Sequence, residues 1–416
     1  MSAGQHLPKQ ALQEQATGPL QGVRVVDLSR LVAGNMLTLQ LGDFGADVIK
    51  VESAGAGDTL REWREPHADH PDGYDGWWRT YARNKRSLAL NLRDGQAMQW
   101  LKRLIATAQV LVESFKPGTL ENMGLSPEQL HADNPGLVIV RLSGWGQTGP
   151  YRELPGFGSL IEGFSGYAHK HRSDGGAPQL PNMALADMVT GLTGAFATLT
   201  ALREVEVRGG QGQVIDLSLL EPMLAIMGPD VSNFAATGVD PEPGQKIASP
   251  RGSYRCEDGL WVSMSGSTDT MAKRVFEAIG QLALFEDPRF SSNAARLDND
   301  AELDAMVAQF MLQRTQVECL KHFRQHGVTV GPIYAPPQLI QDAHVVQRGV
   351  YVQCEASNGN ETTVMHQVTP RLQGTPGSIR RAAPLRGQHT EELLSELGAS
   401  AAECQSLKTQ GAIECR

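Results

Sequence analysis

The sequence predicts an α/β fold of two domains, the larger of which is Rossmann-like with a parallel sheet. From Gly22 to Leu219, short runs rich in Val, Ile and Leu alternate with segments of helical spacing, which is the pattern of right-handed βαβ units. The chain has 416 residues, more than a single hydrophobic core usually serves. A second, smaller α/β domain is therefore expected after the Pro- and Gly-rich stretch GVDPEPGQKIASPRG.

The predicted elements can be placed in order along the chain. Strands are predicted over 23–28, 46–52, 88–92, 109–114, 136–143 and 214–219. Helices are predicted over 35–45, 95–108, 126–134 and 188–202, and in the smaller domain over 270–280 and 301–313. The chain is then expected to comprise a flexible N-terminal tail (1–20), the Rossmann-like domain (21–228), a linker (229–250), the small domain (251–332), and a connector with a C-terminal return to the large domain (333–416).

Composition narrows the class of protein. A net charge of -9 and an isoelectric point near 5.7 disfavour nucleic acids and anionic membranes as partners and favour small molecules. The five cysteines are scattered, with no C-x-x-C pair and no histidine at metal-ligand spacing, which indicates free thiols and no metal site. No apolar leader and no later run of transmembrane length is expected. These features predict a cytoplasmic enzyme.

The motif GWGQTG, Gly144 to Gly149, follows a predicted strand, as a dinucleotide site requires. Pro150 comes next, however, where such a site needs a helix N-terminus that faces the pyrophosphate. We interpret the motif as a glycine-rich loop and not as a site for NAD or FAD. The sequence contains neither a P-loop nor a G-x-S-x-G motif, so nothing in it supports ATP-driven chemistry or a serine hydrolase.

Two segments are candidates for binding a phosphorylated ligand. RNKRS, residues 83–87, concentrates positive charge before a strand, and Phe115 offers an aromatic face beside Lys116 and a Pro-Gly turn. At the carboxyl end of a parallel strand, an aromatic ring, a cation and exposed backbone N–H groups can hold an adenine and its phosphates. The alternative is a solvated surface, where charged side chains usually lie.

Asp187 is the one charged residue between Asp174 and Arg203, in the run PNMALADMVTGLTGAF. Burying a lone carboxylate is costly, so it is either a helix N-cap before the predicted helix or a catalytic group. The residues alone leave these two roles open, and the roles are compatible. An apolar environment raises a carboxyl pKa and helix-terminal N–H groups lower it, so a capped aspartate is expected to be ionised near neutral pH.

Six blocks in order resemble the family III CoA-transferases, the group that includes formyl-CoA transferase, carnitine CoA-transferases and α-methylacyl-CoA racemases. The resemblance covers Gly22 to Glu221, with weaker similarity in the small domain at SPRGSYRCEDGLWVSMS. The blocks are DLSRLVAGNMLTLQLGDFGADVIKVE, NKRSLALNL, VESFKPGTLENMG, SGWGQTGPY, LADMVTG and GQGQVIDLSLLE.

The resemblance implies an interlocked homodimer in which each chain has a large and a small domain joined by long linkers. It implies that Asp187 is the catalytic nucleophile, which passes through an acyl anhydride and an aspartyl-CoA thioester. CoA is then a substrate and product, and no tightly bound cofactor or metal is expected. The family pattern assigns CoA binding to Val32, Ala33, Arg83, Asn84, Lys85, Ser114, Phe115, Lys116, Met123 and Ser143.

Some positions depart from the family pattern. Val32 replaces a glutamine of formyl-CoA transferase, Ser53 replaces an arginine, and Asn122 stands where an arginine often precedes Met-Gly. Gly191 and Gly194 weaken a helix and are interpreted as room for CoA or for the partner chain.

Racemases of the same family catalyse exchange of the proton on the acyl α-carbon, which needs a histidine and an aspartate as general bases. Phe157 and Gly158 stand at those two positions, and phenylalanine cannot take a proton, so a transferase is favoured over the alternative, an α-methylacyl-CoA racemase. A catalytically silent CoA-binding protein is a third hypothesis, against which the intact Asp187 speaks.

The segments ASPRG and GLWVSMS resemble the corresponding segments of family members that take succinyl-CoA as donor. Their acceptors are small dicarboxylates or similar anions of the mesaconate, itaconate, citramalate or sulfinate type. Arg172 and His169 lie close in sequence to the nucleophile and are predicted to supply a cation for the second carboxylate; the alternative is a solvated basic loop.

Overall fold

The computed structural model describes residues 4, 6–13, 15, 18–67, 70–172, 176–240, 246–357, 359 and 361–416. The chain divides into two compact units. The larger consists of residues 1–240 and 348–416, and the smaller of residues 241–347.

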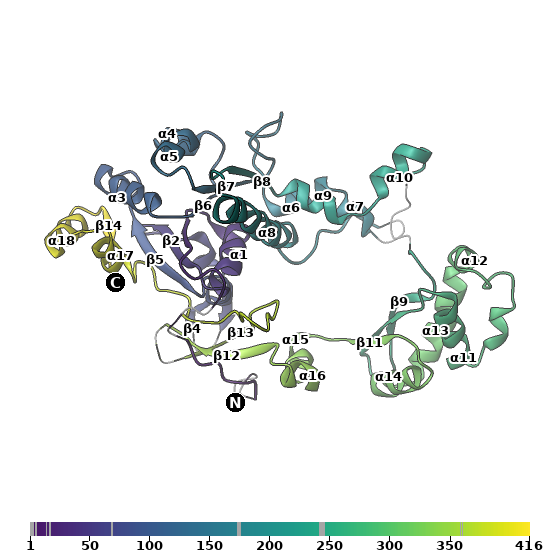
Figure 1. Ribbon diagram of the computed structural model, residues 1–416. Coiled ribbons are helices and arrows are strands. Elements are labelled where there is room, and N and C mark those ends of the chain that lie inside the picture. Colours follow the sequence, from purple (N-terminus) through teal and green to yellow (C-terminus); the bar gives the residue numbers. More distant parts are fainter. Residues whose placement is uncertain are drawn as a thin grey trace. The chain divides into compact units, whose positions relative to one another are not determined.

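A seven-stranded sheet forms the centre of the larger unit, in the order β14-β5-β2-β1-β6-β7-β8 (Figure 1). The strands are β1 (Arg24–Asp27), β2 (Asp47–Ser53), β5 (Lys85–Leu90), β6 (Val110–Glu113), β7 (Val138–Ser143), β8 (Val214–Ser218) and β14 (Ile413–Glu414). All pairs are parallel except β14 with β5. Counted along the chain, the six parallel strands lie in the order 3-2-1-4-5-6, which is the Rossmann order. The predicted α/β class and the parallel sheet are confirmed.

Helices cover both faces of this sheet. On one face, α3 (Gly95–Ala106), α5 (Pro127–Asp133), α17 (Thr390–Glu396) and α18 (Ala401–Thr409) pack on Val26, Ile49 and Leu88. On the other face, α1 (Leu31–Asp43) and α8 (Leu185–Arg208) pack on Val25, Val48 and Val110. Alternate residues of each strand point to opposite faces, so every central strand is apolar on both sides, as the near-continuous Val, Ile and Leu runs predicted.

Further short elements complete the larger unit. They are η1 (Thr59–Glu62), β3 (Glu65–His67), β4 (His70–Tyr74), α2 (Gly76–Tyr81), α4 (Thr119–Asn122), α6 (Gly158–Phe164), α7 (Tyr167–Lys170), α9 (Leu220–Ile226), α10 (Asp230–Thr237), β12 (Tyr351–Glu355) and β13 (Thr362–His366). α10 falls inside 229–250, where the sequence predicted a linker. At the other end, Lys9 pairs with Gln353 of β12 and Gln10 N–H donates to Gln353 O at 2.9 Å, so this part of the predicted tail is attached to the larger unit.

The smaller unit has its own sheet and core. β9 (Arg251–Arg255), β10 (Trp261–Ser265) and β11 (Val330–Ile333) form an antiparallel sheet in the order β11-β10-β9. Its helical elements are α11 (Asp269–Ala278), η2 (Leu282–Phe285), α12 (Asn293–Asp298), α13 (Asp300–Leu312), α14 (Gln316–Gln325), α15 (Pro336–Leu339) and α16 (Ala343–Gln347). Val262, Val275 and Phe323 are buried together in its core.

Gly191 and Gly194 of α8 face α1, which corrects the interpretation that they leave room for CoA or a partner chain. A Cβ at Gly191 would lie 2.6 Å from Met36 Cβ and 2.8 Å from Ala33 O, and a Cβ at Gly194 would lie 2.5 Å from Leu37 Cδ1. The missing side chains let the two helices approach closely, and this contact holds the start of α8 against the start of α1.

Replacing Gly191 with alanine is expected to destabilise the fold by about 1–3 kcal/mol, because its Cβ would meet the backbone of α1. Gly194→Ala is the matched control. Its Cβ meets the ends of the Leu37 and Leu217 side chains, which can move, and alanine gains about 1 kcal/mol of helix propensity. Urea unfolding of both variants measures the difference, and equal midpoints would contradict the packing argument.

α8 is long and apolar enough, by length and composition, to cross a membrane. The sequence analysis expected no such run, and this expectation is wrong. The core helix of a soluble protein passes the same test. In this chain Ala195, Ala201 and Leu202 of α8 are buried in the core of the larger unit, and 44% of the apolar stretch is buried.

Candidate active site

Asp187 lies in the first turn of α8, as the third residue of the helix. The N-cap is Ala184, so the predicted start at Met188 with Asp187 as N-cap is wrong. The helix starts earlier because another element supplies the cap: Glu162 of α6 accepts a hydrogen bond from Ala186 N–H at 3.1 Å. The side chain of Asp187 is therefore not the N-cap of α8.

The carboxylate of Asp187 faces the N-terminus of α1. Burial, followed by the nearby charge of Glu162, raises the pKa of Asp187 from 3.8 to about 6. Hydrogen bonds from the backbone N–H groups of Ala33 and of Asp187 itself act in the opposite direction. At neutral pH most of this carboxylate is ionised, but it is more basic than an ordinary aspartate.

A buried polar layer beneath α1 holds its first residue, Leu31, two residues before Ala33. Asp58 accepts from Leu31 N–H at 3.0 Å, and Leu31 has the left-handed φ of 61°. Lys50 Nζ lies 3.0 Å from Asp58 and 3.2 Å from Asp27, with all three side chains at most 1% exposed. Burial opposes ionisation of Asp27, but Lys50 and Lys85 hold its pKa at about 2. The layer fixes the otherwise unfavourable backbone at Leu31 and so the direction of the first N–H groups of α1.

Gly158, the first residue of α6, lies directly against the carboxylate. A Cβ at this position would be 2.4 Å from Asp187 Oδ2 and 3.8 Å from Glu162 Oε1. Any side chain here would therefore displace the Asp187 carboxylate. Phe157, immediately before it, is 61% exposed.

Polar and aromatic side chains gather where β1 and β6 end. Arg30 follows β1, and its N–H donates to Ser114 Oγ at 3.1 Å. Phe115 and the exposed Lys116 come next in the chain after Ser114. β1 and β6 are neighbours at the point where the strand order reverses, which is where Rossmann-like sheets bind ligands, and α1, which carries Ala33, starts at the same edge.

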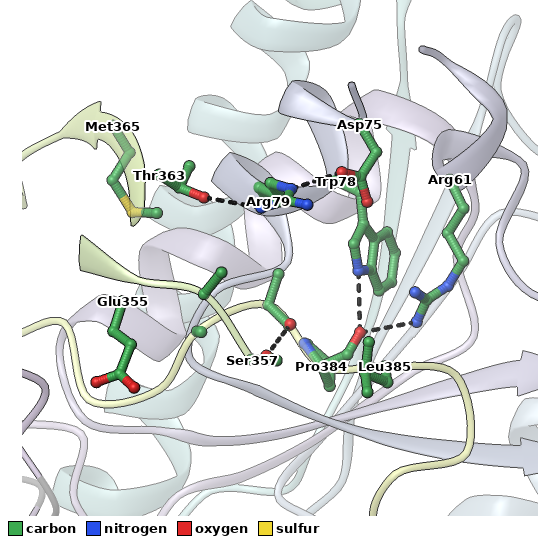
Figure 2. A pocket seen from close by; sticks show the side chains of 13 residues that line it. Arg61, Asp75, Trp78, Arg79, Glu355, Ser357, Thr363, Met365, Pro384 and Leu385 are labelled. Atoms are coloured by element: carbon green, nitrogen blue, oxygen red, sulfur yellow. Dashed lines mark hydrogen bonds and ion pairs between the residues drawn. The ribbon is translucent and has the colours of Figure 1, made fainter. Parts of the chain in front are cut away.

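A cavity of about 70 Å³ lies elsewhere in the larger unit (Figure 2). Its polar groups are bonded to one another: Arg79 pairs with Asp75 at 2.6 Å, and Arg61 and Trp78 both donate to Pro384 O at 3.1 Å. None of the site residues predicted from the sequence lines it. Its size, close to that of a few water molecules, excludes it as a CoA site.

Comparison with known proteins decides the family. The sequence model described as CoA-transferase family III matches residues 20–390. The chain belongs to the family III CoA-transferases. It is 37% identical over 386 residues to a succinyl-CoA–D-citramalate CoA-transferase of Chloroflexus aurantiacus, with 91% of this chain and 94% of that one covered. It is 36% identical to the beta subunit of a succinyl-CoA–L-malate CoA-transferase of the same organism, with 92% and 94% covered.

A solved structure agrees with this assignment. The crystal structure of a CAIB/BAIF family protein from Brucella suis superimposes with a TM-score of 0.81 at 30% identity, covering 92% of this chain and all of that one. The resemblance read from the six sequence blocks is thus confirmed, and so is the assignment of the protein as a CoA-transferase enzyme.

The family III CoA-transferase pattern assigned CoA to Arg83, Asn84 and Lys85, but their side chains are buried in ion pairs and hydrogen bonds. Arg83 and Asn84 bind Asp43 at 2.6 Å and 2.8 Å, and Lys85 binds Asn35 Oδ1 at 2.6 Å. Arg83 and Asn84 precede β5 and Lys85 is its first residue, whereas Asp187 accepts from Ala33 N–H near the start of α1. A contact between these side chains and CoA would require those bonds to break.

The other predicted CoA residues lie at or near the carboxyl edge. Val32 is buried against Leu60 and Trp78, and Ala33 faces Asp187 through its N–H. Met123 is half-buried against the core, and Ser143 Oγ accepts from Gly146 N–H at 3.0 Å, which shapes the glycine loop. A Cβ on Gly144 would lie 2.3 Å from Gly156 Cα, and Gly146 and Gly149 have the left-handed φ values of 94° and 85°.

The predicted acceptor cations lie on or after α7. His169 is exposed, Arg172 is half-buried, and within the described part of the chain neither has a hydrogen bond or ion pair that joins it to Asp187. The neighbouring Lys170 pairs with Asp230 of α10 at 2.5 Å. Among the described residues no group of His, Cys, Asp and Glu could hold a metal ion.

Arg30 and Glu162 are not among the site residues predicted from the sequence. Arg30 could have been found from its position directly after the first strand. Glu162 could have been found in the same way as Asp187, because it is an isolated acidic residue: between Glu153 and Lys170 the only other titratable side chains are those of Tyr167 and His169.

Proposed function

We propose that the enzyme moves CoA from succinyl-CoA to a small dicarboxylate through covalent intermediates on Asp187. The observation that carries the proposal is a basic, half-buried carboxylate held against the N-terminus of α1. A nucleophilic carboxylate must be ionised, and this one forms no ion pair among the described residues.

In the proposed cycle the Asp187 carboxylate attacks the thioester carbonyl of the donor. The C–S bond breaks, CoA leaves as thiolate, and an aspartyl-acyl anhydride remains. The thiolate then attacks the aspartyl carbonyl, releasing the donor acid as its carboxylate and leaving an aspartyl-CoA thioester. The acceptor carboxylate reverses these steps and leaves as the new acyl-CoA, so one thioester replaces another without ATP. N–H groups at the start of α1 are placed to stabilise the developing oxyanions.

Two relatives support the choice of substrates. Their names give succinyl-CoA as donor and D-citramalate or L-malate as acceptor, both dicarboxylates that carry a hydroxyl group. We place the CoA phosphates and adenine at the carboxyl ends of β1 and β6, near Arg30, Ser114, Phe115 and Lys116.

The racemase alternative is not favoured. Gly158 stands at the position of the second base, and the Asp187 carboxylate fills the space that its side chain would need. Phe157, at the position of the first base, has no group that exchanges protons.

Mass spectrometry tests the proposal directly. Incubation with succinyl-CoA should leave a CoA-sized, hydroxylamine-sensitive mass on the peptide that contains Asp187. A panel of free dicarboxylates should then remove this mass and yield the matching acyl-CoA. An adduct on a cysteine instead would overturn the mechanism, and an adduct removed only by monocarboxylates would overturn the substrate class.

We also propose that the enzyme is a homodimer, interlocked as the family resemblance implies. Exposed apolar side chains recur along α8 at Leu192, Phe196 and Leu199, with Phe196 72% exposed, and others lie on α10 at Val231 and Phe234. An apolar stripe of this kind usually lies in an interface. Sedimentation should give about twice the chain mass of 45.0 kDa. A monomer, or assembly only with a second kind of subunit, would contradict the proposal.

A further inference from the structure

Glu162 is a buried carboxylate beside the proposed nucleophile. It is 3% exposed, lies on α6, and accepts from Ala186 N–H at 3.1 Å, one residue before Asp187. Within the described residues no lysine, arginine or histidine forms an ion pair with it. A Cβ on Gly158 would come within 4 Å of both carboxylates, so the two acidic groups border the same small space.

Other charged groups on the surrounding elements are directed elsewhere. In the described part of the chain, Glu162 is the one charged side chain that shifts the pKa of Asp187; the other cause that raises this pKa is burial. The charged groups on the elements packed against α6 and α8 are Asp43 on α1, His169 and Lys170 on α7, Arg203, Glu204, Glu206 and Arg208 at the far end of α8, Glu221 on α9, Arg141 on β7 and Asp216 on β8. Several are already paired: Asp43 with Arg83, Lys170 with Asp230, and Arg141 with Glu113.

We propose that Glu162 is a positioning residue whose fixed charge disfavours the free Asp187 carboxylate and thereby favours its acylated forms. This inference rests on the proposed function, because it requires Asp187 to be the nucleophile. When Asp187 becomes an anhydride or a thioester, it loses its negative charge, and that charge leaves with the thiolate or the donor acid. Repulsion from Glu162 is present in the free enzyme and relieved in the covalent one, so it shifts the equilibrium toward the covalent enzyme.

A purely structural role for Glu162 predicts something different. As a cap for α8, only its oxygen matters, and a glutamine amide oxygen accepts from Ala186 N–H equally well. As a charge, its carboxylate matters, and glutamine removes it while keeping size and hydrogen bond. Glu162→Gln therefore separates the two roles, and Glu162→Ala, which loses both, is the comparison variant.

Two measurements on the purified full chain test the charge role. In Glu162→Gln, the acid limb of the kcat/KM profile should move to lower pH than in the wild type, because the charge of Glu162 raises the pKa of Asp187. At a fixed ratio of succinyl-CoA to succinate, intact mass spectrometry should show several-fold less aspartyl-CoA thioester than in the wild type. Glu162→Ala should show the same pH shift together with a lower melting temperature.

The outcomes are distinguishable from failure of the proposed function. If Glu162→Gln keeps the wild-type acid limb and thioester occupancy while only Glu162→Ala is impaired, Glu162 is a cap and the inference is wrong. If the wild-type enzyme forms no adduct on Asp187 at all, the proposed function fails, whichever result Glu162→Gln gives in the pH profile. Unchanged CoA binding in Glu162→Gln confirms that the variant is folded.

Discussion

Replacing Asp187 with asparagine is expected to lower kcat for CoA transfer by at least about a thousandfold, because the amide cannot attack a thioester or carry the covalent CoA. The Michaelis constant for the acyl-CoA should change little, since the proposed contacts to CoA lie at the ends of β1 and β6. Initial rates with succinyl-CoA and a dicarboxylate measure both quantities. Asp187→Ala controls for residual activity caused by deamidation of the asparagine.

The same substitution has an expected effect on stability that a damaged fold would not produce. Since the folded state raises the pKa of Asp187 from 3.8 to about 6, its ionised form is disfavoured in the folded state. The cost is absent below pH 3.8, develops between pH 3.8 and about 6, and is complete above about 6. Asp187→Asn should therefore raise the melting temperature at pH 8 but not at pH 3.5.

Wild-type rates of CoA transfer in Asp187→Asn would contradict the assignment of Asp187 as the nucleophile.

The sheet could be predicted from the sequence because each parallel strand is buried on both faces. The run VIVRLS, for example, is apolar at four of its six positions, and its first three residues are all apolar. β5 was predicted to begin at Leu88 and begins at Lys85. Its first two residues, Lys85 and Arg86, are charged, and they are buried in ion pairs with Asp27 and Asp47, which come from distant parts of the chain. No local pattern reveals a charge that is neutralised by such a partner.

The start of α8 shows the same limit at the site. Local rules place a cap at the residue before the apolar run, which made Asp187 the candidate. The carboxylate that caps the helix is that of Glu162, on a helix that is separate in sequence, so Asp187 became available for chemistry. The sequence could identify the nucleophile as an isolated charge but not the neighbour that tunes it.

The six family blocks predicted the activity correctly, but they did not predict which of the binding residues are accessible. A block shows only which residue types occur, and the structure shows which of them are exposed. Lys116 is exposed near the nucleophile's edge of the sheet, whereas Lys85, in an equally basic block, is buried and bonded to Asn35. Arg30, which no block singled out, is exposed beside Ser114.

Replacing Gly158 with alanine is expected to lower kcat by about a hundredfold while leaving the fold intact. The new methyl group would lie 2.4 Å from Asp187 Oδ2, and the carboxylate, at the end of a flexible side chain, can rotate away at little cost in stability. A displacement of about 1 Å at the reacting atom is enough for a loss of this size.

Gly163→Ala is the matched control for Gly158→Ala, since it lies on the same helix and a Cβ there meets no atom within 4 Å. Its rate should equal that of the wild type. Its melting temperature should be the same or slightly higher, because alanine favours the helix. Steady-state rates and thermal unfolding of the two variants measure this contrast. Full activity in Gly158→Ala would mean that the Asp187 carboxylate reacts from another orientation than the one against α6. Loss of stability in that variant alone would mean that Asp187 cannot move aside.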